Sequence, residues 1–156
     1  MFACSNCMIT QLVTLRGNKM ELQIGLSSEK EMIVTENDLA SVSGNIGAEV
    51  LSTHCLVLLM ELAARQVVEG RIPKDKITLG THVDIRHFSA ALVGSRVRAV
   101  ARLIAVEHHR LHFHVAAYDD VEKLAEGENE QVIVSRNLFL KKIRRKTHNK
   151  QQSDRQ

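Results

Sequence analysis

The chain has 156 residues, 44% hydrophobic and 25% charged, a balance typical of a single globular domain that excludes a globally disordered chain. No apolar run reaches the roughly 18–20 residues that cross a membrane, and the N-terminus lacks the basic start of a secretory signal, so we expect a cytoplasmic protein with no membrane partner. Three cysteines, an odd number, do not favour a secreted disulfide framework.

The formal net charge of +3 is unevenly distributed along the chain. Residues 141–156 hold seven Lys or Arg and one Asp, a local charge of +6, so residues 1–140 sum to −3. We expect a loosely ordered N-terminal extension at 1–19, a folded domain at 20–140 and a basic tail at 141–156. The extension carries a lone C-x-x-C at Cys4 and Cys7, which we interpret as reduced thiols because no second ligand pair accompanies it.

Short apolar alternations after Met20 indicate a strand, and residues 36–50 predict a loop because they lack a clear period. A helix is predicted at roughly 54–69, where Ser52 or Thr53 can cap its first amides and Gly70 with Pro73 can end it. The first half of this helix is apolar nearly all round, which predicts deep burial.

Everything between Pro73 and Ser135 has the alternation of long β-strands, with a turn at Gly94. In the first strand we expect Ile77, Leu79, Val83, Ile85 and His87 on one face and Gly80, His82, Asp84 and Arg86 on the other. In the next two we expect Val97, Ala99, Ala101 and Leu103, then Leu111, Phe113, Val115 and Ala117, to face inward, and roughly 123–135 to form the last strand. One buried helix followed by an antiparallel meander predicts an α+β fold whose sheet wraps the helix.

Glu61 is a carboxylate within the apolar helix, and burial of a carboxylate costs several kcal/mol unless it is paired or hydrogen-bonded. Thr53 stands at the start of the helix, where free N–H groups can hold an oxyanion, and His87 ends a strand. Each residue alone has an ordinary structural explanation: a cap, a paired carboxylate or a core histidine. Together they are the groups needed for attack on an activated carbonyl.

Three separated segments resemble those of the hot-dog-fold acyl-CoA thioesterases, and most of all the branch typified by fluoroacetyl-CoA thioesterase. They are "VLST" with the apolar helix after it, "GTHVDIRH" and "VGSRVRAVARL". Thr53 stands eight residues before Glu61, His87 stands 26 after it, and Gly80 stands seven before His87. The resemblance covers about residues 20–140 and implies a hot-dog fold, in which a curved antiparallel sheet wraps a long central helix.

The resemblance implies hydrolysis of an acyl-CoA to a free acid and CoA, with no metal and no cofactor beyond the CoA of the substrate. By this resemblance, the family's Thr–Glu–His set corresponds to Thr53, Glu61 and His87. Thr53 would position or attack the carbonyl, His87 would act as acid or base, and Glu61 would activate water or the nucleophile, with the choice of general base left open. Gly80 would mark a close approach of backbone to substrate. A homodimer or higher homo-oligomer with the site at the subunit interface is also implied.

Two departures from the family pattern leave the acyl group open. The fluoroacetyl-specific enzyme closes its pocket with phenylalanines in the loop before the helix, where this chain has Gly44 and Gly47. Near Gly127 the family commonly reads Gly-x-His-x-Arg, whereas this chain has Asn129 and Gln131. We expect Gln131 to bind the substrate, and the missing arginine supports an alternative function, a non-catalytic acyl-CoA-binding hot-dog protein.

His54 and Cys55 form a conspicuous pair, but neighbours on a helix point about 100° apart, so we expect them to be poorly placed as base and nucleophile. Cys55 is interpreted as a small core residue, and His54, next to Thr53, as a pocket-lining residue that binds substrate. His112 and His114 share one face of their strand, opposite Leu111 and Phe113, so we place them on the outer surface and expect no functional metal site.

The basic tail is a further candidate, this time for nucleic-acid binding. It has no aromatic residue to stack on bases, so we expect a solvated, mobile tail and no nucleic-acid partner. A narrower alternative is that Lys141, Lys142 or Arg144 reach the phosphates of CoA.

Overall fold

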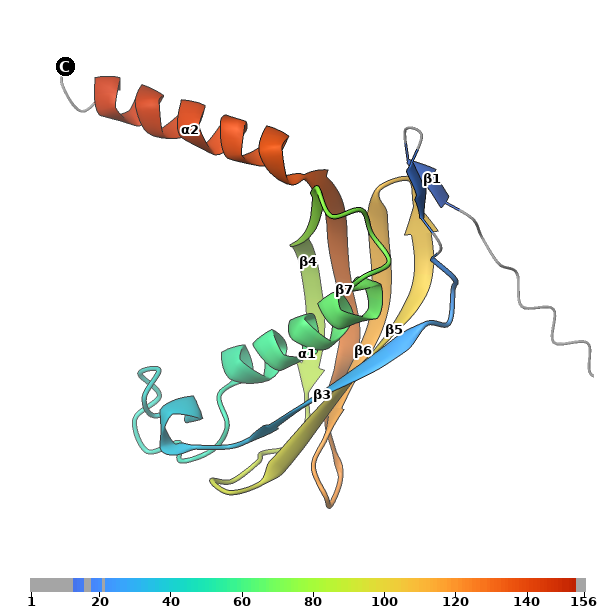
Figure 1. The fold of residues 1–156 in the computed structure, drawn as a ribbon. Coiled ribbons are helices and arrows are strands. Elements are labelled where there is room, and N and C mark those ends of the chain that lie inside the picture. The colour runs from blue at the N-terminus through green and yellow to red at the C-terminus, as the bar shows by residue number, and fades with distance from the viewer. Residues whose placement is uncertain (1–12, 16–17, 21, 154–156) are drawn as a thin grey trace, which may run out of the picture.

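A single curved, antiparallel five-stranded sheet packs around one long helix (Figure 1). The computed structural model describes residues 13–15, 18–20 and 22–153. The sheet has the order β3-β5-β6-β7-β4. Its strands are β3 (Ser27–Ile33), β4 (Lys76–His87), β5 (Arg96–Glu107), β6 (Arg110–Tyr118) and β7 (Lys123–Ser135). The predicted α+β class and the expected last strand are confirmed.

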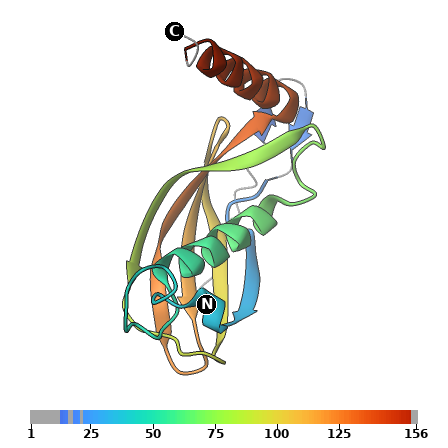
Figure 2. The ribbon, with the colours of Figure 1, turned by 90° about the vertical axis from the view of Figure 1, so that its left-hand side faces the viewer.

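The helix α1 (Thr53–Val68) lies across the concave face of the sheet (Figure 2). Ser52 caps it by accepting a hydrogen bond from the backbone N–H of Cys55, so the predicted helix at 54–69 is displaced by one residue. The inward residues expected on β5 and β6 are all fully buried against it, which is the core of the domain. The prediction of deep burial for the whole first half of α1 is wrong, because Leu58 is 53% exposed.

A bulge in β4 changes which of its residues face the helix. The pairing of β4 with β7 shifts between Gly80 and His82, so Thr81 is an extra residue without a partner. The expected single face from Ile77 to His87 is therefore wrong. Residues of β4 opposite the inward-facing side chains of β7 are Thr78, Gly80, Val83, Ile85 and His87, while Ile77 and Leu79 belong to the opposite face. The bulge places Gly80 and His87 on the helix side of the same strand.

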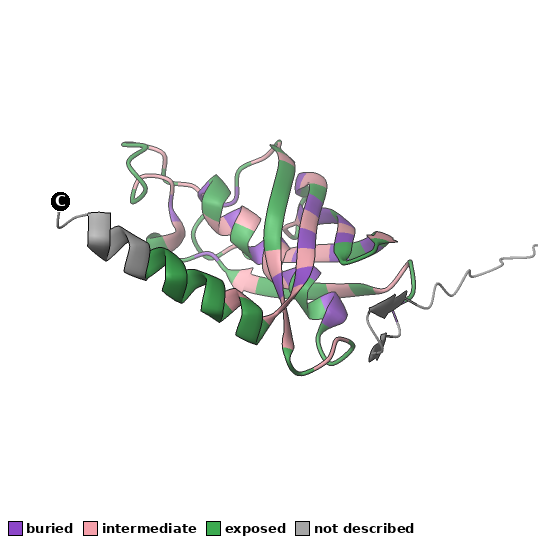
Figure 3. Ribbon diagram, turned by 90° about the horizontal axis from the view of Figure 1, so that it is seen from above, coloured by how far each residue is buried: buried purple, intermediate pink, exposed green. Residues whose placement is uncertain are grey.

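The two ends of the chain differ from expectation in different ways. Most of 1–19 lies outside the described residues, but β1 (Val13–Leu15) and β2 (Asn18–Met20) pair as a small two-stranded sheet. The expected mobile tail is instead largely helical: α2 (Arg136–Ser153) follows β7 directly and projects from the sheet (Figures 1 and 2). Its described side chains are mostly exposed (Figure 3), which fits the expected solvation, while the expected mobility stays a prediction. No helix among the described residues is long and apolar enough to cross a membrane.

Candidate active site

Thr53 and His87, 34 residues apart in the chain, meet at the N-terminal end of α1. The hydroxyl Oγ1 of Thr53 lies 3.0 Å from Nδ1 of His87, a hydrogen bond in which either partner can donate, depending on the imidazole tautomer. Thr53 is exposed, whereas Nε2 of His87 is buried and has no hydrogen-bond partner within the described part of the chain. The pair is thus an exposed hydroxyl bound to an imidazole whose second nitrogen is enclosed by the protein.

Glu61 lies elsewhere on the helix, beside the middle of β4. Its carboxylate faces Gly80 so closely that a Cβ added to this glycine would lie 2.5 Å from Oε1. Thr53 is eight residues earlier, which is about 12 Å along the axis at ~1.5 Å per residue. Within one chain, therefore, two of the three predicted catalytic residues are in contact and Glu61 is at a separate position with Gly80.

Two buried amide side chains of β7 stand behind Glu61. Asn129, 1% exposed, donates from Nδ2 to Oε1 of Glu61 over 3.4 Å. Gln131, 2% exposed, donates from Nε2 to the Oδ1 of Asn129 over 3.0 Å and to the backbone carbonyl of Glu61 over 3.3 Å. These bonds tie the carboxylate and its helix turn to the sheet. The expectation that Gln131 contacts the substrate directly finds no support in this geometry, and sequence reasoning alone did not give Asn129 a role.

A hollow of about 370 Å³ lies at the start of α1, and Thr53 and His54 line it together with the loop before the helix. His54 is bound on two sides: Nδ1 lies 3.4 Å from the hydroxyl of Ser43, and Nε2 lies 3.3 Å from Sγ of Cys55. The side chains of His54 and Cys55 are thus in contact despite the 100° between neighbouring helix positions, while the expectation that they do not act as base and nucleophile stays a prediction. Cys55 is half-buried and packs at the edge of the core, as expected.

The loop that forms the wall of this hollow is held in place by local hydrogen bonds. The hydroxyl and backbone N–H of Thr35 both donate to the Asp38 carboxylate, which lowers the pKa of that carboxyl below its usual value. The backbone of Asp38 in turn accepts from the N–H of Ser52 at the cap of α1. The position of Thr53 thus depends on the fold of the loop as well as on the helix.

The histidines of β6 lie away from this site. His112 and His114 are on the outer face of the sheet, as predicted, and His112 contacts the carboxylates of Glu107 and Glu130. No group of three or more metal-binding side chains occurs among the described residues.

Two comparisons with known proteins agree on one family. The model of the fluoroacetyl-CoA-specific thioesterase family matches residues 34–137. The fluoroacetyl-CoA thioesterase of Streptantibioticus cattleyicolor is 32% identical over 99 residues, which are 64% of this chain and 71% of that protein.

Solved structures show the same fold. A thioesterase superfamily member from Thermus thermophilus has a TM-score of 0.77 at 29% identity, covering 82% of this chain and 95% of its own. A structure of the fluoroacetyl-CoA thioesterase has a TM-score of 0.75 at 24% identity, covering 80% and 97%. A hot-dog-like protein from Thermanaerovibrio acidaminovorans has a TM-score of 0.74 at 21% identity, covering 79% and 91%. The family model spans the loop, α1 and every strand from β4 to β7, and so the chain belongs to the fluoroacetyl-CoA-specific thioesterase family, with the hot-dog fold.

Proposed function

We propose that the protein hydrolyses an acyl-CoA thioester to a free acid and CoA, and that Thr53, His87 and Glu61 carry the reaction. The observation that carries the assignment is the 3.0 Å hydrogen bond between Thr53 and His87, formed in a chain that belongs to a thioesterase family. A hydroxyl bound to an imidazole is the arrangement in which the imidazole accepts the hydroxyl proton as a nucleophile attacks a carbonyl. The CoA thiolate leaves and takes up a proton, and water supplies the second oxygen of the acid.

The separate position of Glu61 supports a site shared between two copies of the chain. β4 is an edge strand of twelve residues, and Val83 within it and Phe88 directly after it are each at least 40% exposed. Antiparallel pairing of two β4 edges about a two-fold axis would bring the C-terminal end of one β4 toward the N-terminal half of the other. Thr53 and His87 of one copy would then approach Glu61 and Gly80 of its partner. We therefore propose a homodimer, acting in the cytoplasm, with a composite site.

Subunit mixing tests this arrangement directly. Chains carrying Glu61→Ala and chains carrying His87→Ala are each expected to be nearly inactive, but a re-equilibrated equal mixture should recover activity. Half of the dimers would then be mixed, and each mixed dimer would hold one intact site, so we expect about a quarter of the wild-type rate. The measurement is thiol release after co-refolding, with the unmixed variants as controls. A mixture as inactive as its components would refute the shared site.

The acyl group is expected to differ from fluoroacetate. Gly44 and Gly47 have φ of +100° and +88°, a left-handed conformation that aromatic side chains rarely adopt, so this loop does not offer phenylalanines in the same backbone. The hollow beside Thr53 is instead lined by small and polar residues, namely Ala40, Ser43, Gly44, Asn45, Ser52, Thr53 and His54.

A panel of acyl-CoA chain lengths in a thiol-detecting assay tests the activity and the substrate class together. We expect turnover of a short acyl-CoA and little preference for the fluoroacetyl ester over the acetyl ester. Saturable binding of CoA esters with no thiol release anywhere in the panel would instead identify a non-catalytic acyl-CoA-binding protein.

Replacing Gly80 by alanine is expected to lower kcat about tenfold or more while leaving the thermal midpoint within a few degrees. The added Cβ would lie 2.5 Å from Oε1 of Glu61. The flexible end of Glu61 can move aside at little cost in stability, but the carboxylate is then misplaced for the reaction. Rate assays measure kcat, and thermal unfolding measures the midpoint. Gly127→Ala is the matched control: its Cβ would overlap the backbone carbonyl of Asp84 on β4, so it should lower stability first.

Asn129 is expected to act through Glu61. Asn129→Ala removes the N–H that holds Oε1 and should lower kcat about tenfold with little change in KM. In a Glu61→Ala background the same substitution should have almost no further effect on kcat, because the group that it positions is gone. The measurement is a double-mutant cycle on kcat. Equal losses in both backgrounds would show that Asn129 only supports the fold.

A further inference from the structure

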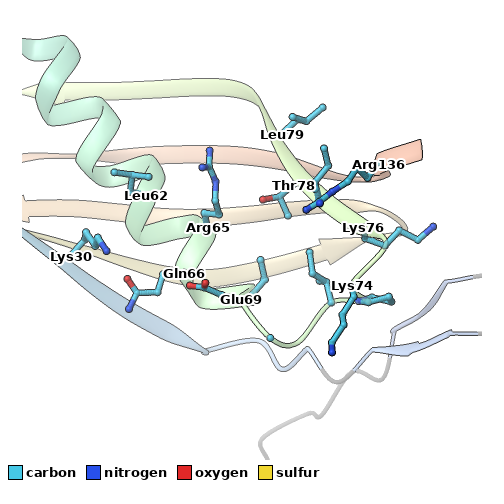
Figure 4. A pocket seen from close by; sticks show the side chains of 15 residues that line it. Lys30, Leu62, Arg65, Gln66, Glu69, Lys74, Lys76, Thr78, Leu79 and Arg136 are labelled. Atoms are coloured by element: carbon cyan, nitrogen blue, oxygen red, sulfur yellow. The ribbon is translucent and has the colours of Figure 1, made fainter. Parts of the chain in front are cut away.

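A second cavity, far from Thr53, opens at the C-terminal end of α1 (Figure 4). It has a volume of about 620 Å³ and lies between α1, the connection after it and the first residues of β4. One residue of β3, Lys30, and the first residue of α2, Arg136, also line it. Four elements and one connection therefore surround a single space, which is large enough to hold a substantial part of a ligand.

The lining of this cavity is strongly cationic. It contains five basic side chains, Lys30, Arg65, Lys74, Lys76 and Arg136, and one carboxylate, that of Glu69, a local charge of +4. Residues 1–140, which supply all of them, sum to −3, so the cavity is positive against a negative background. Among the described residues, ion pairing of these five is limited to Lys76, which contacts Asp75 at 3.8 Å.

The cavity begins close to the candidate active site. Arg65, which lines it, stands one helical turn after Glu61 on the same face of α1, and Thr78, which also lines it, stands two residues before Gly80 on the same face of β4. From there the lining passes along Thr78 to Lys74, Lys76 and Arg136 at the far end of β4. A ligand whose reacting group lies at Glu61 would thus extend toward a group of cations.

We propose that this cavity binds the phosphate groups of the CoA portion of the substrate, with Arg65, Lys74 and Arg136 as the main ligands. The proposal rests on the proposed function. CoA ends in an adenosine with a 3′-phosphate and a 5′-diphosphate, and guanidinium and ammonium groups bind phosphate oxygens with charge-assisted hydrogen bonds. The flexible, uncharged arm of CoA lies between these phosphates and the thioester, so the cations that bind the phosphates stand apart from the reacting group.

A charge-reversed double variant, Lys74→Glu with Arg136→Glu, tests the assignment. Both residues are exposed, so the fold should tolerate the change. We expect KM for the acyl-CoA to rise about tenfold or more, since the variant replaces charge-assisted hydrogen bonds to phosphate by repulsion, and kcat to stay within about twofold. With the same acyl group on pantetheine, which lacks every phosphate, the variant and the wild type should have the same kcat/KM.

The matched control is Lys141→Glu with Lys142→Glu, which makes the same charge change further along α2. It should leave KM for the acyl-CoA unaltered. A rise in KM in this control but not in the cavity variant would assign the phosphates to the basic helix and overturn the proposal. Equal losses with acyl-CoA and acyl-pantetheine in the cavity variant would also overturn it, because they would report a damaged site.

A binding measurement separates this proposal from the proposed function. Adenosine 3′,5′-bisphosphate is titrated calorimetrically into the wild type and into the cavity variant. Binding that is lost in the cavity variant would support the cavity even if no acyl-CoA were hydrolysed. Absence of binding to the wild type, in a protein that turns over acyl-CoA, would refute the cavity and leave the hydrolase function standing.

Discussion

Glu61→Ala is expected to lower kcat for acyl-CoA hydrolysis by about 10²–10⁴-fold, the range of a group that transfers a proton in the transition state. Among the residues that the structure describes, the carboxylate accepts one N–H, from Asn129 at 3.4 Å, and the glycine at position 80 leaves room for it beside β4. The free energy of unfolding should change little, because Glu61 is only half-buried and the Asn129 amide that it releases still donates to the backbone carbonyl of His82 over 3.5 Å. Steady-state thiol release and thermal unfolding measure the two quantities separately.

Glu69→Ala is the control for Glu61, since it removes an exposed carboxylate immediately after α1. It should retain the wild-type kcat. Glu61→Gln keeps the shape and should be as slow as the alanine variant if the negative charge is required. A Glu61→Ala protein with the full wild-type rate would remove Glu61 from the mechanism.

His87→Ala is expected to lower kcat by about 10²–10⁴-fold as well, because Thr53 then has no partner for its proton. Thr53→Ala should lower it strongly, and the double variant should be no slower than the slower single variant, since residues that act as a unit show non-additive losses. Thr53→Ser keeps the hydroxyl and should recover most of the rate. The measurement is the complete double-mutant cycle on kcat.

His82→Ala is the control for His87. His82 lies on the same strand but pairs with Glu130 on the outer face, so its loss should leave kcat unchanged. Additive losses from Thr53→Ala and His87→Ala would contradict a functional unit. In that case the 3.0 Å hydrogen bond would be only a structural link between the cap of α1 and the end of β4.

Local pattern was sufficient for most of the fold. Alternation identified the inward residues of β5 and β6, and capping residues placed α1 within one residue of its true start. The alternation pattern failed on β4, where one extra residue, Thr81, reverses which residues face the helix. A bulge forms through pairing with a neighbouring strand, here β7, and the residues of β4 alone carry no signal for it. The basic charge of residues 141–156 favours a solvated tail and gives no signal for α2, although Lys, Arg and Leu are good helix formers.

The sequence by itself determined which residues have the chemistry: a hydroxyl at the start of α1, a carboxylate within it and a histidine at the end of a strand. Residue identity and spacing were enough to name these groups, because the chemistry of a side chain is set by its residue type. Only the tertiary structure decided that Thr53 meets His87, that Asn129 stands behind Glu61, and that distant cations gather in one cavity. These are relations between segments far apart in the chain, and they are set by the curvature and register of the sheet around the helix.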